Sequence, residues 1–141
     1  DLMHKTTVAG ALEVPDSRFA DWFPDLGKYN VMADCAVGGL VVYGQEHPTD
    51  ALFQNVDELA TVNAQLFLGD RQLDAGVSKE VLGNPLNSLQ WLVKKLASQG
   101  KVFRQGQLVS SGTFVLPPKL VQGHWLVRFD HGLGKVELTV Q

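Results

Sequence analysis

The sequence predicts an α+β domain in which curled mixed or antiparallel β-sheets pack with one long helix. Short apolar runs bounded by glycine and turn residues dominate the chain, and these are typical of strands. A single stretch, residues 86–96, repeats its apolar side chains at helical spacing. The length of 141 residues suits one hydrophobic core. We therefore expect residues 1–141 to form one domain that combines hairpins with a single helix.

The first third of the chain predicts three short elements. Residues 1–7 suit the last turn of a helix or an irregular lead-in, and residues 8–14 suit the first strand. Residues 28–36 are confined between glycines and suit a short helix. Residues 39–44 are apolar, β-branched and bounded by glycines, so a buried strand is expected there before a loop at 45–49.

Two hairpins are predicted in the rest of the chain. Residues 59–68 and 71–77 flank Gly69-Asp70, where a leading glycine suits a type II′ turn. Residues 125–129 and 135–140 pair across residues 131–134. Further strands are expected at residues 107–111 and 113–115.

The long helix has clear start and stop signals. Asn84 is a suitable N-cap, Pro85 suits the first helical position, and Gly100 suits the left-handed terminator. The apolar stripe is expected to be core, together with Trp91, and consists of Leu86, Leu89, Leu92, Val93 and Leu96.

Composition excludes several classes of partner. Apolar residues make up 45% and charged residues 19% of the chain, with a net charge of −3, as in ordinary globular proteins. No basic surplus is present for nucleic acid, and no apolar run approaches the roughly 20 residues that span a bilayer. The single Cys35 excludes an internal disulfide, suits a reducing cytoplasm, and is expected to be buried and unreactive. No signal peptide is recognised, and the start at Asp1 suggests that an N-terminal portion is missing.

The stretch from Gly10 to Arg18 contains the most informative polar residues. On a strand, Leu12 and Val14 point to one side and Glu13 to the other. An ionised glutamate is costly to bury unless it is paired or bound to a cation. The residues alone leave open an exposed Glu13, an ion pair with Arg18, or an oxygen ligand for a hard divalent cation.

Four stretches together resemble a known family. They are Ala-Leu-Glu-Val-Pro-Asp-Ser-Arg-Phe at residues 11–19, Ala-Asp-Cys-Ala at 33–36, the helix start at 82–92, and Ser110-Ser111-Gly112 followed by Gln122-Gly123 and Gly132-Leu133-Gly134. In this order and spacing they resemble the C-terminal half of the 2-keto-4-pentenoate hydratase and 4-oxalocrotonate decarboxylase group of the fumarylacetoacetate hydrolase superfamily.

The resemblance implies a divided metal site. Glu13 would be the third carboxylate ligand of Mg²⁺ or Mn²⁺, whereas the family's Glu-x-Glu pair, a lysine and an aspartate lie upstream of the matched segment. Asp16, Ser17 and Asp34 would take catalytic or supporting roles around that ligand. Arg18 and Ser111 would contact the substrate. The N-terminal portion of the family's fold is absent from this chain.

The chemistry implied is that of a cytoplasmic lyase of aromatic catabolism. Its metal would chelate the carboxylate and 2-oxo groups of a 2-hydroxydienoate or 2-oxo acid and stabilise the enolate. A hydratase then adds water to the conjugated double bond, while a decarboxylase releases CO₂. A homo-oligomer, or association with the missing N-terminal half, is expected.

Departures from the family pattern favour a second hypothesis. Cys35, Val37 and Asn84 replace the family's usual asparagine, serine and histidine, and Gln122-Gly123-His124 replaces its Pro-Gly-Asp turn. Some polar groups expected at the substrate are therefore absent. The alternative is a non-catalytic remnant, which would serve as a structural or partner-binding module.

Overall fold

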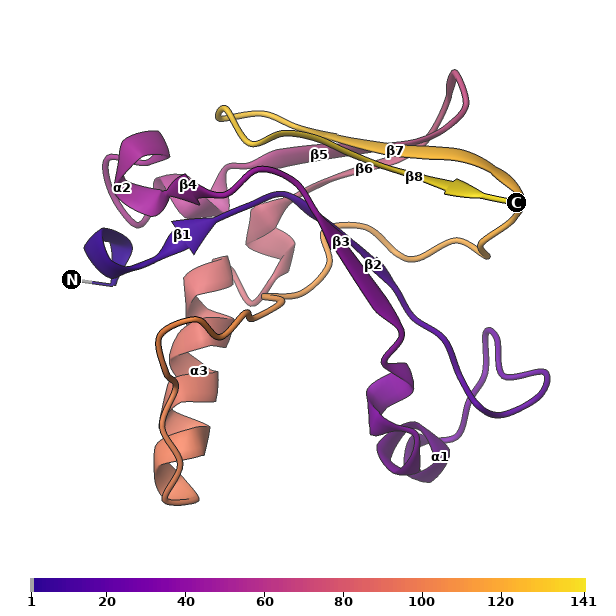
Figure 1. The fold of residues 1–141 in the computed structure, drawn as a ribbon, viewed down its shortest axis with the longest axis horizontal. Helices are drawn as coiled ribbons and strands as arrows, with labels where there is room; N and C mark the ends of the chain where they lie inside the picture. The colour runs from indigo at the N-terminus through magenta and orange to yellow at the C-terminus, as the bar shows by residue number, and fades with distance from the viewer. Residues whose placement is uncertain (1) are drawn as a thin grey trace.

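A four-stranded antiparallel sheet forms the body of the molecule in the computed structural model, which describes residues 2–141 (Figure 1). Its strands lie side by side in the order β6 (Arg71–Val77), β5 (Asn63–Leu68), β7 (Gly123–Phe129) and β8 (Gly134–Val140). Both predicted hairpins are confirmed, since β5 pairs with β6 and β7 with β8. Of the two turn residues between β5 and β6, only Gly69 has a positive φ, +57°, as a type II′ turn requires.

Alternation along β5 gives this sheet a buried face. Ala64 and Leu66 are buried, whereas Asn63 and Gln65 are exposed. The buried members of this first apolar cluster are Ala64, Leu66, Trp125, Val127 and Val136. A second cluster contains Met3, Phe53, Leu59, Val62 and Leu133. Phe114 and Phe129 pack against both clusters, so the two form one continuous core.

The predicted strand at residues 8–14 is divided into two strands with different partners. β1 (Thr7–Val8) pairs with β4 (His47–Pro48), and β2 (Ala11–Val14) pairs with β3 (Leu40–Tyr43). The break falls at Gly10, where an added Cβ would overlap the ring of Phe129. Only glycine, which lacks a Cβ, fits against the Phe129 ring where the chain passes from β1 to β2.

The helical elements are short, with one exception. They are η1 (Met3–Lys5), α1 (Lys28–Ala33), η2 (Cys35–Val37), α2 (Thr49–Leu52), η3 (Glu58–Ala60), η4 (Ser78–Glu80) and α3 (Pro85–Ser98). α3 begins as predicted, because the Asn84 side chain accepts a hydrogen bond from the Leu86 N–H at 2.9 Å. Of the predicted lead-in at residues 1–7, Asp1 lies outside the described residues.

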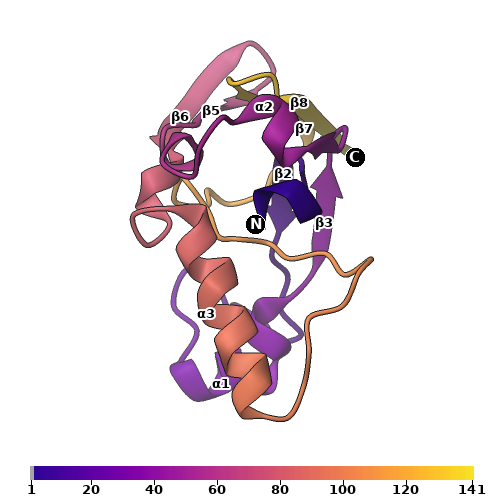
Figure 2. The same cartoon turned by 90° about the vertical axis from the view of Figure 1, so that its left-hand side faces the viewer.

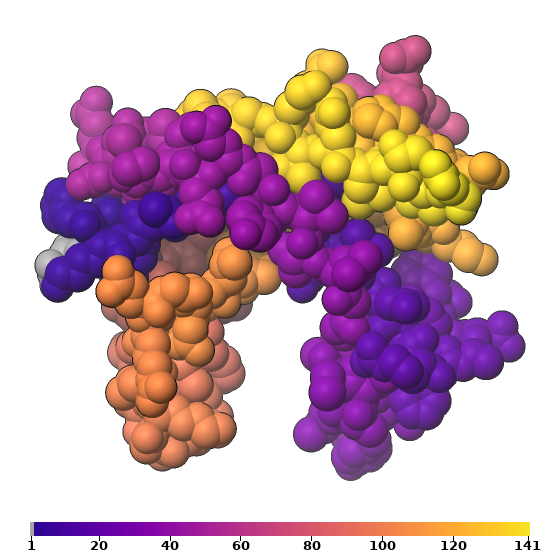
Figure 3. Space-filling view, viewed as in Figure 1, coloured from indigo at the N-terminus to yellow at the C-terminus, as the bar shows by residue number. Residues whose placement is uncertain are grey.

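Two parts of the chain project from the same side of the sheet. The first, here called the α3 projection, comprises α3 and the irregular return segment 101–111; the second, the β2–β3 projection, comprises residues 11–43, which include β2, α1, η2 and β3 (Figures 1 and 2). The space-filling view shows an open hollow between them (Figure 3). Large exposed apolar side chains lie on both projections and include Tyr29, Met32, Leu40, Trp91, Val102 and Leu108.

Burial on the projections differs from the sequence predictions. All residues of α3 are described and none is buried, and Trp91 is 62% exposed, so the prediction that this helix lies in the core is wrong. In its first turn, Leu86 packs against the second cluster. The predicted strand at 39–44 forms as β3, but Val42 is its one half-buried residue, because β3 touches the sheet by a single face.

The strands predicted at residues 107–111 and 113–115 do not form, although both segments are described. The Thr113 hydroxyl donates to the Val115 carbonyl and accepts from the Val115 N–H, which removes backbone groups that a strand ladder would need. Gly112, with a φ of +124°, turns the backbone away from an extended path just before this point. The segment is held instead by packing of Phe114 on the core.

The crossing at Gly10 provides a test of the fold. Gly10→Ala is expected to lower the free energy of unfolding by about 1–3 kcal/mol, since the new methyl group meets the Phe129 ring. Gly27→Ala is the matched control, because nothing lies within 4 Å of a Cβ there. Urea unfolding followed by tryptophan fluorescence measures both. Equal effects of the two substitutions would contradict the crossing at Gly10.

Candidate functional site

Glu13 lies on the outward face of the β2–β3 ribbon. It pairs with Val41, and the alternation of the strands places Ala11 and Tyr43 on the same face. All four residues are exposed. Leu12 and Val42 point the other way and pack against the sheet. The ribbon therefore presents one carboxylate, surrounded by apolar neighbours, away from the core.

Beyond the end of β2, Ser17 and Arg18 surround the buried carboxylate of Asp34. The Arg18 Nε donates to Asp34 Oδ1 at 2.5 Å, and the Arg18 backbone N–H lies 3.4 and 3.3 Å from the two carboxylate oxygens. The Ser17 hydroxyl makes a further hydrogen bond to this carboxylate. The Asp34 side chain is 4% exposed and that of Arg18 57%, so the ion pair lies at the surface with its acidic member inside.

The surroundings of Asp34 determine its ionisation. Burial alone would raise the pKa of this carboxyl, but the hydrogen bond from Ser17 and the contacts with Arg18 outweigh burial and lower the pKa below its ordinary value. Asp34 is therefore ionised at neutral pH. A carboxylate in this state accepts hydrogen bonds or a proton and does not act as an acid.

Asp34 begins a turn with an unusual backbone. Cys35, Ala36 and Val37 all have left-handed φ angles, of 53°, 58° and 54°. Each such residue costs on the order of 1–3 kcal/mol when it is not glycine, and a β-branched valine is especially unfavourable. The surrounding contacts must therefore hold residues 34–38, which we call the 34–38 turn.

Arg18 contacts the 34–38 turn at both of its ends. Besides the carboxylate of Asp34, its guanidinium donates to the Asp34 carbonyl and, from Nη1, to the Gly38 carbonyl at 2.8 Å. Three of its five N–H donors are thus used within the chain. The Asp16 N–H adds a bond to the Val37 carbonyl at 2.9 Å. Sequence reasoning missed the carbonyl acceptors of this turn, for which the Gly38-Gly39 pair was the available signal.

The remaining predicted residues are less closely joined to this cluster. The side chain of Asp16 is exposed beside the turn, and Ser111 lies on the α3 projection, where its carbonyl accepts a hydrogen bond from the Ser88 hydroxyl at 2.7 Å. Cys35 is exposed, so the prediction that it is buried is wrong. The structure therefore brings Ser17, Arg18 and Asp34 together and holds Ser111 on another element.

A divalent cation needs several oxygen ligands, and the described residues supply too few. Among residues 2–141, no group of three or more histidine, cysteine, aspartate or glutamate side chains is placed to hold a metal ion. Six to eight oxygens are usual for Ca²⁺ and six for Mg²⁺. Glu13 alone therefore does not fit a complete metal site, and other ligands would have to come from outside these residues.

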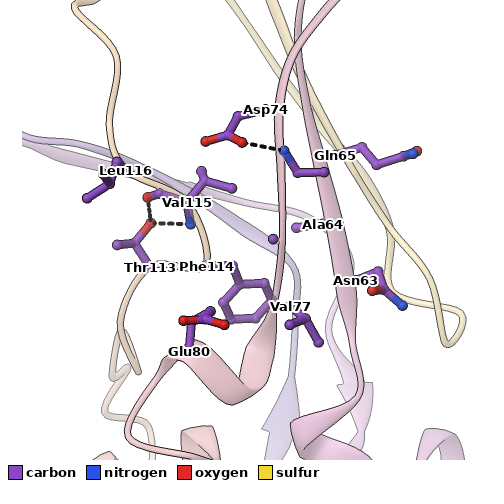
Figure 4. Close-up of a pocket in the computed structure, with 12 residues that line it drawn as sticks. Asn63, Ala64, Gln65, Asp74, Val77, Glu80, Thr113, Phe114, Val115 and Leu116 are labelled. Carbon is purple, nitrogen blue, oxygen red and sulfur yellow. Dashed lines mark hydrogen bonds between the residues drawn. The ribbon is translucent and has the colours of Figure 1, made fainter.

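A cavity elsewhere in the molecule contains none of the predicted site residues. It has a volume of about 760 Å³ and is formed by β5, β6 and residues 113–116 (Figure 4). Two of its polar residues bond their own neighbours: Asp74 accepts from the Ala75 N–H at 2.8 Å, and Thr113 bonds the backbone of Val115. Because none of the predicted site residues lines this cavity, the candidate site remains the Glu13 ribbon and the Asp34 cluster.

Two solved structures with this fold are of 4-oxalocrotonate decarboxylase from Pseudomonas putida G7. The one complexed with calcium and acetate has a TM-score of 0.77 and 27% identity, covering 93% of this chain and 47% of that chain. The one complexed with magnesium and adipate has a TM-score of 0.75 and 26% identity, covering 90% and 46%. The predicted α+β class, with one long helix and a resemblance to the fumarylacetoacetate hydrolase superfamily, is therefore confirmed.

Sequence relatives agree with this class. The 2-keto-4-pentenoate hydratase of Burkholderia vietnamiensis is 33% identical over 143 residues, 99% of this chain and 51% of that protein. The hydratase of the same name from Paraburkholderia phymatum is 34% identical over 114 residues, 79% of this chain and 41% of that protein. No family model matches the chain. The chain is thus related to the 2-keto-4-pentenoate hydratase and 4-oxalocrotonate decarboxylase group, and it spans about half the length of the curated relatives it matches.

Within residues 2–141, every helix is too short or too polar to cross a bilayer.

The ionisation of Asp34 gives a pH test of the cluster. Because its pKa is lower in the folded chain than the ordinary 3.8, Asp34 stabilises the fold above that pH, and this stabilisation is lost as the pH falls through the folded value. Asp34→Asn is expected to lower stability at pH 7, and the difference from the wild type should shrink below about pH 3.8. Urea titrations between pH 7 and pH 3 measure this difference.

The matched control for this test is Asp25→Asn, which removes an exposed carboxylate outside the cluster. It is expected to leave stability nearly unchanged throughout the pH range. A constant difference between wild type and Asp34→Asn at every pH would contradict the role given to the Arg18 and Ser17 contacts.

Proposed function

We propose that this chain forms the Glu13-bearing part of a lyase of the 2-keto-4-pentenoate hydratase type, which adds water to a 2-hydroxydienoate or 2-oxo acid. The observation that carries the proposal is the 33% identity with such a hydratase across almost the whole chain. The ordered Glu13 strand and Asp34 cluster support it. The activity would belong to the assembly of this chain with the half of the fold that it does not span.

The metal proposed is Mg²⁺ or Mn²⁺, with Glu13 as one carboxylate ligand. Support comes from the magnesium and calcium complexes of the decarboxylase. The exposed position of Glu13 on a paired strand is consistent with a ligand that completes a site from one side. The remaining ligands would come from the complementary half.

The neighbouring residues are proposed to support the site. Asp34 would remain ionised and hold Ser17 and Arg18 in place, while the exposed Asp16 is free to accept a proton near the substrate. The two guanidinium N–H groups of Arg18 that are not used within the chain would reach the substrate carboxylate. Ser111 would contact substrate from the α3 projection.

The partner is proposed to cover the two projections. The apolar stripe of α3 is half-buried, and both projections carry exposed large apolar side chains. Exposed apolar side chains of this kind favour an interface. The complementary half would fill the hollow between the projections; a homo-oligomer that covers the same surface is the alternative.

A second candidate function follows from the shortage of ligands. The described residues contain no group of three metal-binding side chains, as expected of a non-catalytic remnant that serves as a structural or partner-binding module. This hypothesis predicts no heat of Mn²⁺ binding to the 141-residue chain in titration calorimetry. Micromolar binding that Glu13→Gln abolishes would exclude it.

The lyase proposal is tested by activity of the assembled protein. Together with a complementary half from a hydratase relative, the chain is expected to consume a 2-hydroxydienoate in the presence of Mg²⁺ or Mn²⁺, as measured by the loss of dienoate absorbance. Glu13→Gln should reduce kcat by at least about a hundredfold, because it removes a charged ligand. Glu46→Gln, another exposed glutamate to amide change, is the control and should retain activity.

Two outcomes would count against the proposal. Full activity of Glu13→Gln would exclude Glu13 as a ligand. Absence of turnover by a stable assembly, with either metal present, would favour the remnant.

A further inference from the structure

We propose that Arg18 is a positioning residue, which closes the 34–38 turn and thereby fixes β3 against β2 in the register that presents Glu13. The link to Glu13 rests on the proposed function, whereas the closing of the turn does not. Arg18 would then be needed before any substrate binds, in addition to its expected contact with the substrate carboxylate.

The three acceptors of the Arg18 guanidinium lie at the two ends of the turn. The Arg18 guanidinium reaches the carboxylate and the carbonyl of Asp34 at the start of the turn, and the carbonyl of Gly38 at its end. One planar group therefore joins both ends of a segment of five residues. A hydrogen bond to either end alone would leave the other free to move.

Contacts within the 34–38 turn are too few to stabilise its backbone conformation. Its three central residues, Cys35, Ala36 and Val37, are all in the left-handed region, which side chains with a Cβ disfavour. Inside the turn, the Val37 N–H donates to the Asp34 carbonyl at 3.1 Å, an ordinary length, and the Gly38 N–H donates to the Cys35 carbonyl at 3.3 Å, which is long. The contacts from residues 16–18 must supply the rest.

The 34–38 turn is linked to both β2 and β3. The turn leads directly through Gly39 into β3, and residues 16–18 follow directly after β2. Gly39 packs so closely on the Val14 carbonyl that a Cβ would not fit. A displacement of the 34–38 turn would therefore move β3 along β2 and change the residue opposite Glu13, which is Val41 in the structure.

The chemistry of the side chain favours arginine specifically. A guanidinium is a rigid planar fork, and its N–H groups point in fixed directions toward separate acceptors. A lysine ammonium keeps the charge but is a point donor on a flexible stem, so it can pair with the Asp34 carboxylate without reaching the Gly38 carbonyl. Arg18→Lys therefore separates the ion pair from the closing of the turn.

Hydrogen exchange measured by NMR tests the positioning role. In Arg18→Lys and in Arg18→Gln, exchange of the paired amides in β2 and β3 is expected to accelerate at least tenfold, while that of β5, β7 and β8 changes less than twofold. Arg71→Lys, a substitution of an exposed arginine at the far hairpin, is the control and should change neither group. Asp34→Asn, which leaves both carbonyl acceptors in place, should give a smaller acceleration than Arg18→Gln.

Two results would overturn the proposal. Protection of β2 and β3 within twofold of the wild type in Arg18→Lys would show that the fork is unnecessary. An equal loss of protection in all strands would show that Arg18 contributes only general stability. Both results can be read from Arg18→Lys, which retains the charge and is the variant that should fold most readily.

A separate measurement distinguishes this proposal from that of the metal site. In the assembly of the chain with a complementary half, bound Mn²⁺ broadens nearby amide signals, so broadening at β2 of the wild-type chain that is lost in Glu13→Gln would report the ligand. Weaker broadening in Arg18→Lys is the expected result if the presentation of Glu13 depends on the turn. Absence of broadening in the wild type would count against the Glu13 ligand alone, and the exchange rates would still decide the role of Arg18.

Discussion

The ion pair between Arg18 and Asp34 is the contact on which the outer part of the molecule depends. The 34–38 turn contains three consecutive left-handed residues, and one of the two hydrogen bonds inside it is long, so contacts with its neighbours are needed to hold its geometry. The guanidinium provides that constraint from its fixed fork, and the buried carboxylate keeps the fork in place. Because the turn joins α1 to β3, this pair determines how the Glu13 ribbon is arranged beyond the reach of the hydrophobic core.

The residues that stabilise the fold and the residues of the candidate site lie in different parts of the molecule. The sheet and its two apolar clusters contain nearly all of the buried apolar residues. From the projections, Leu12, Val42 and Leu86 pack against these clusters. The projections carry the polar residues of the candidate site and most of the exposed apolar surface. Glu13 therefore lies on a part of the molecule held by hydrogen bonds and charge, which favours a site completed by a partner.

Local signals in the sequence were sufficient for some elements and insufficient for others. The Gly69-Asp70 hairpin and the Asn84 cap could be predicted because their determinants lie within a few residues. The absence of buried residues from α3 could not be predicted, since an apolar stripe has the same sequence pattern whether or not an element covers it fully. The left-handed turn was also missed, because Cys35, Ala36 and Val37 have no propensity for it. The partnership of Arg18 with Asp34 spans sixteen residues and is invisible to patterns of short range.

The path of the chain between β6 and β7 has an evolutionary consequence. Residues 78–122 leave the sheet, form η4 and the α3 projection, and return to a strand that pairs with β5, so both ends of the excursion are anchored in the same sheet. Substitutions on the outer surface of α3 can accumulate with little effect on how the sheet folds. The surface that α3 presents can therefore diverge independently of the core.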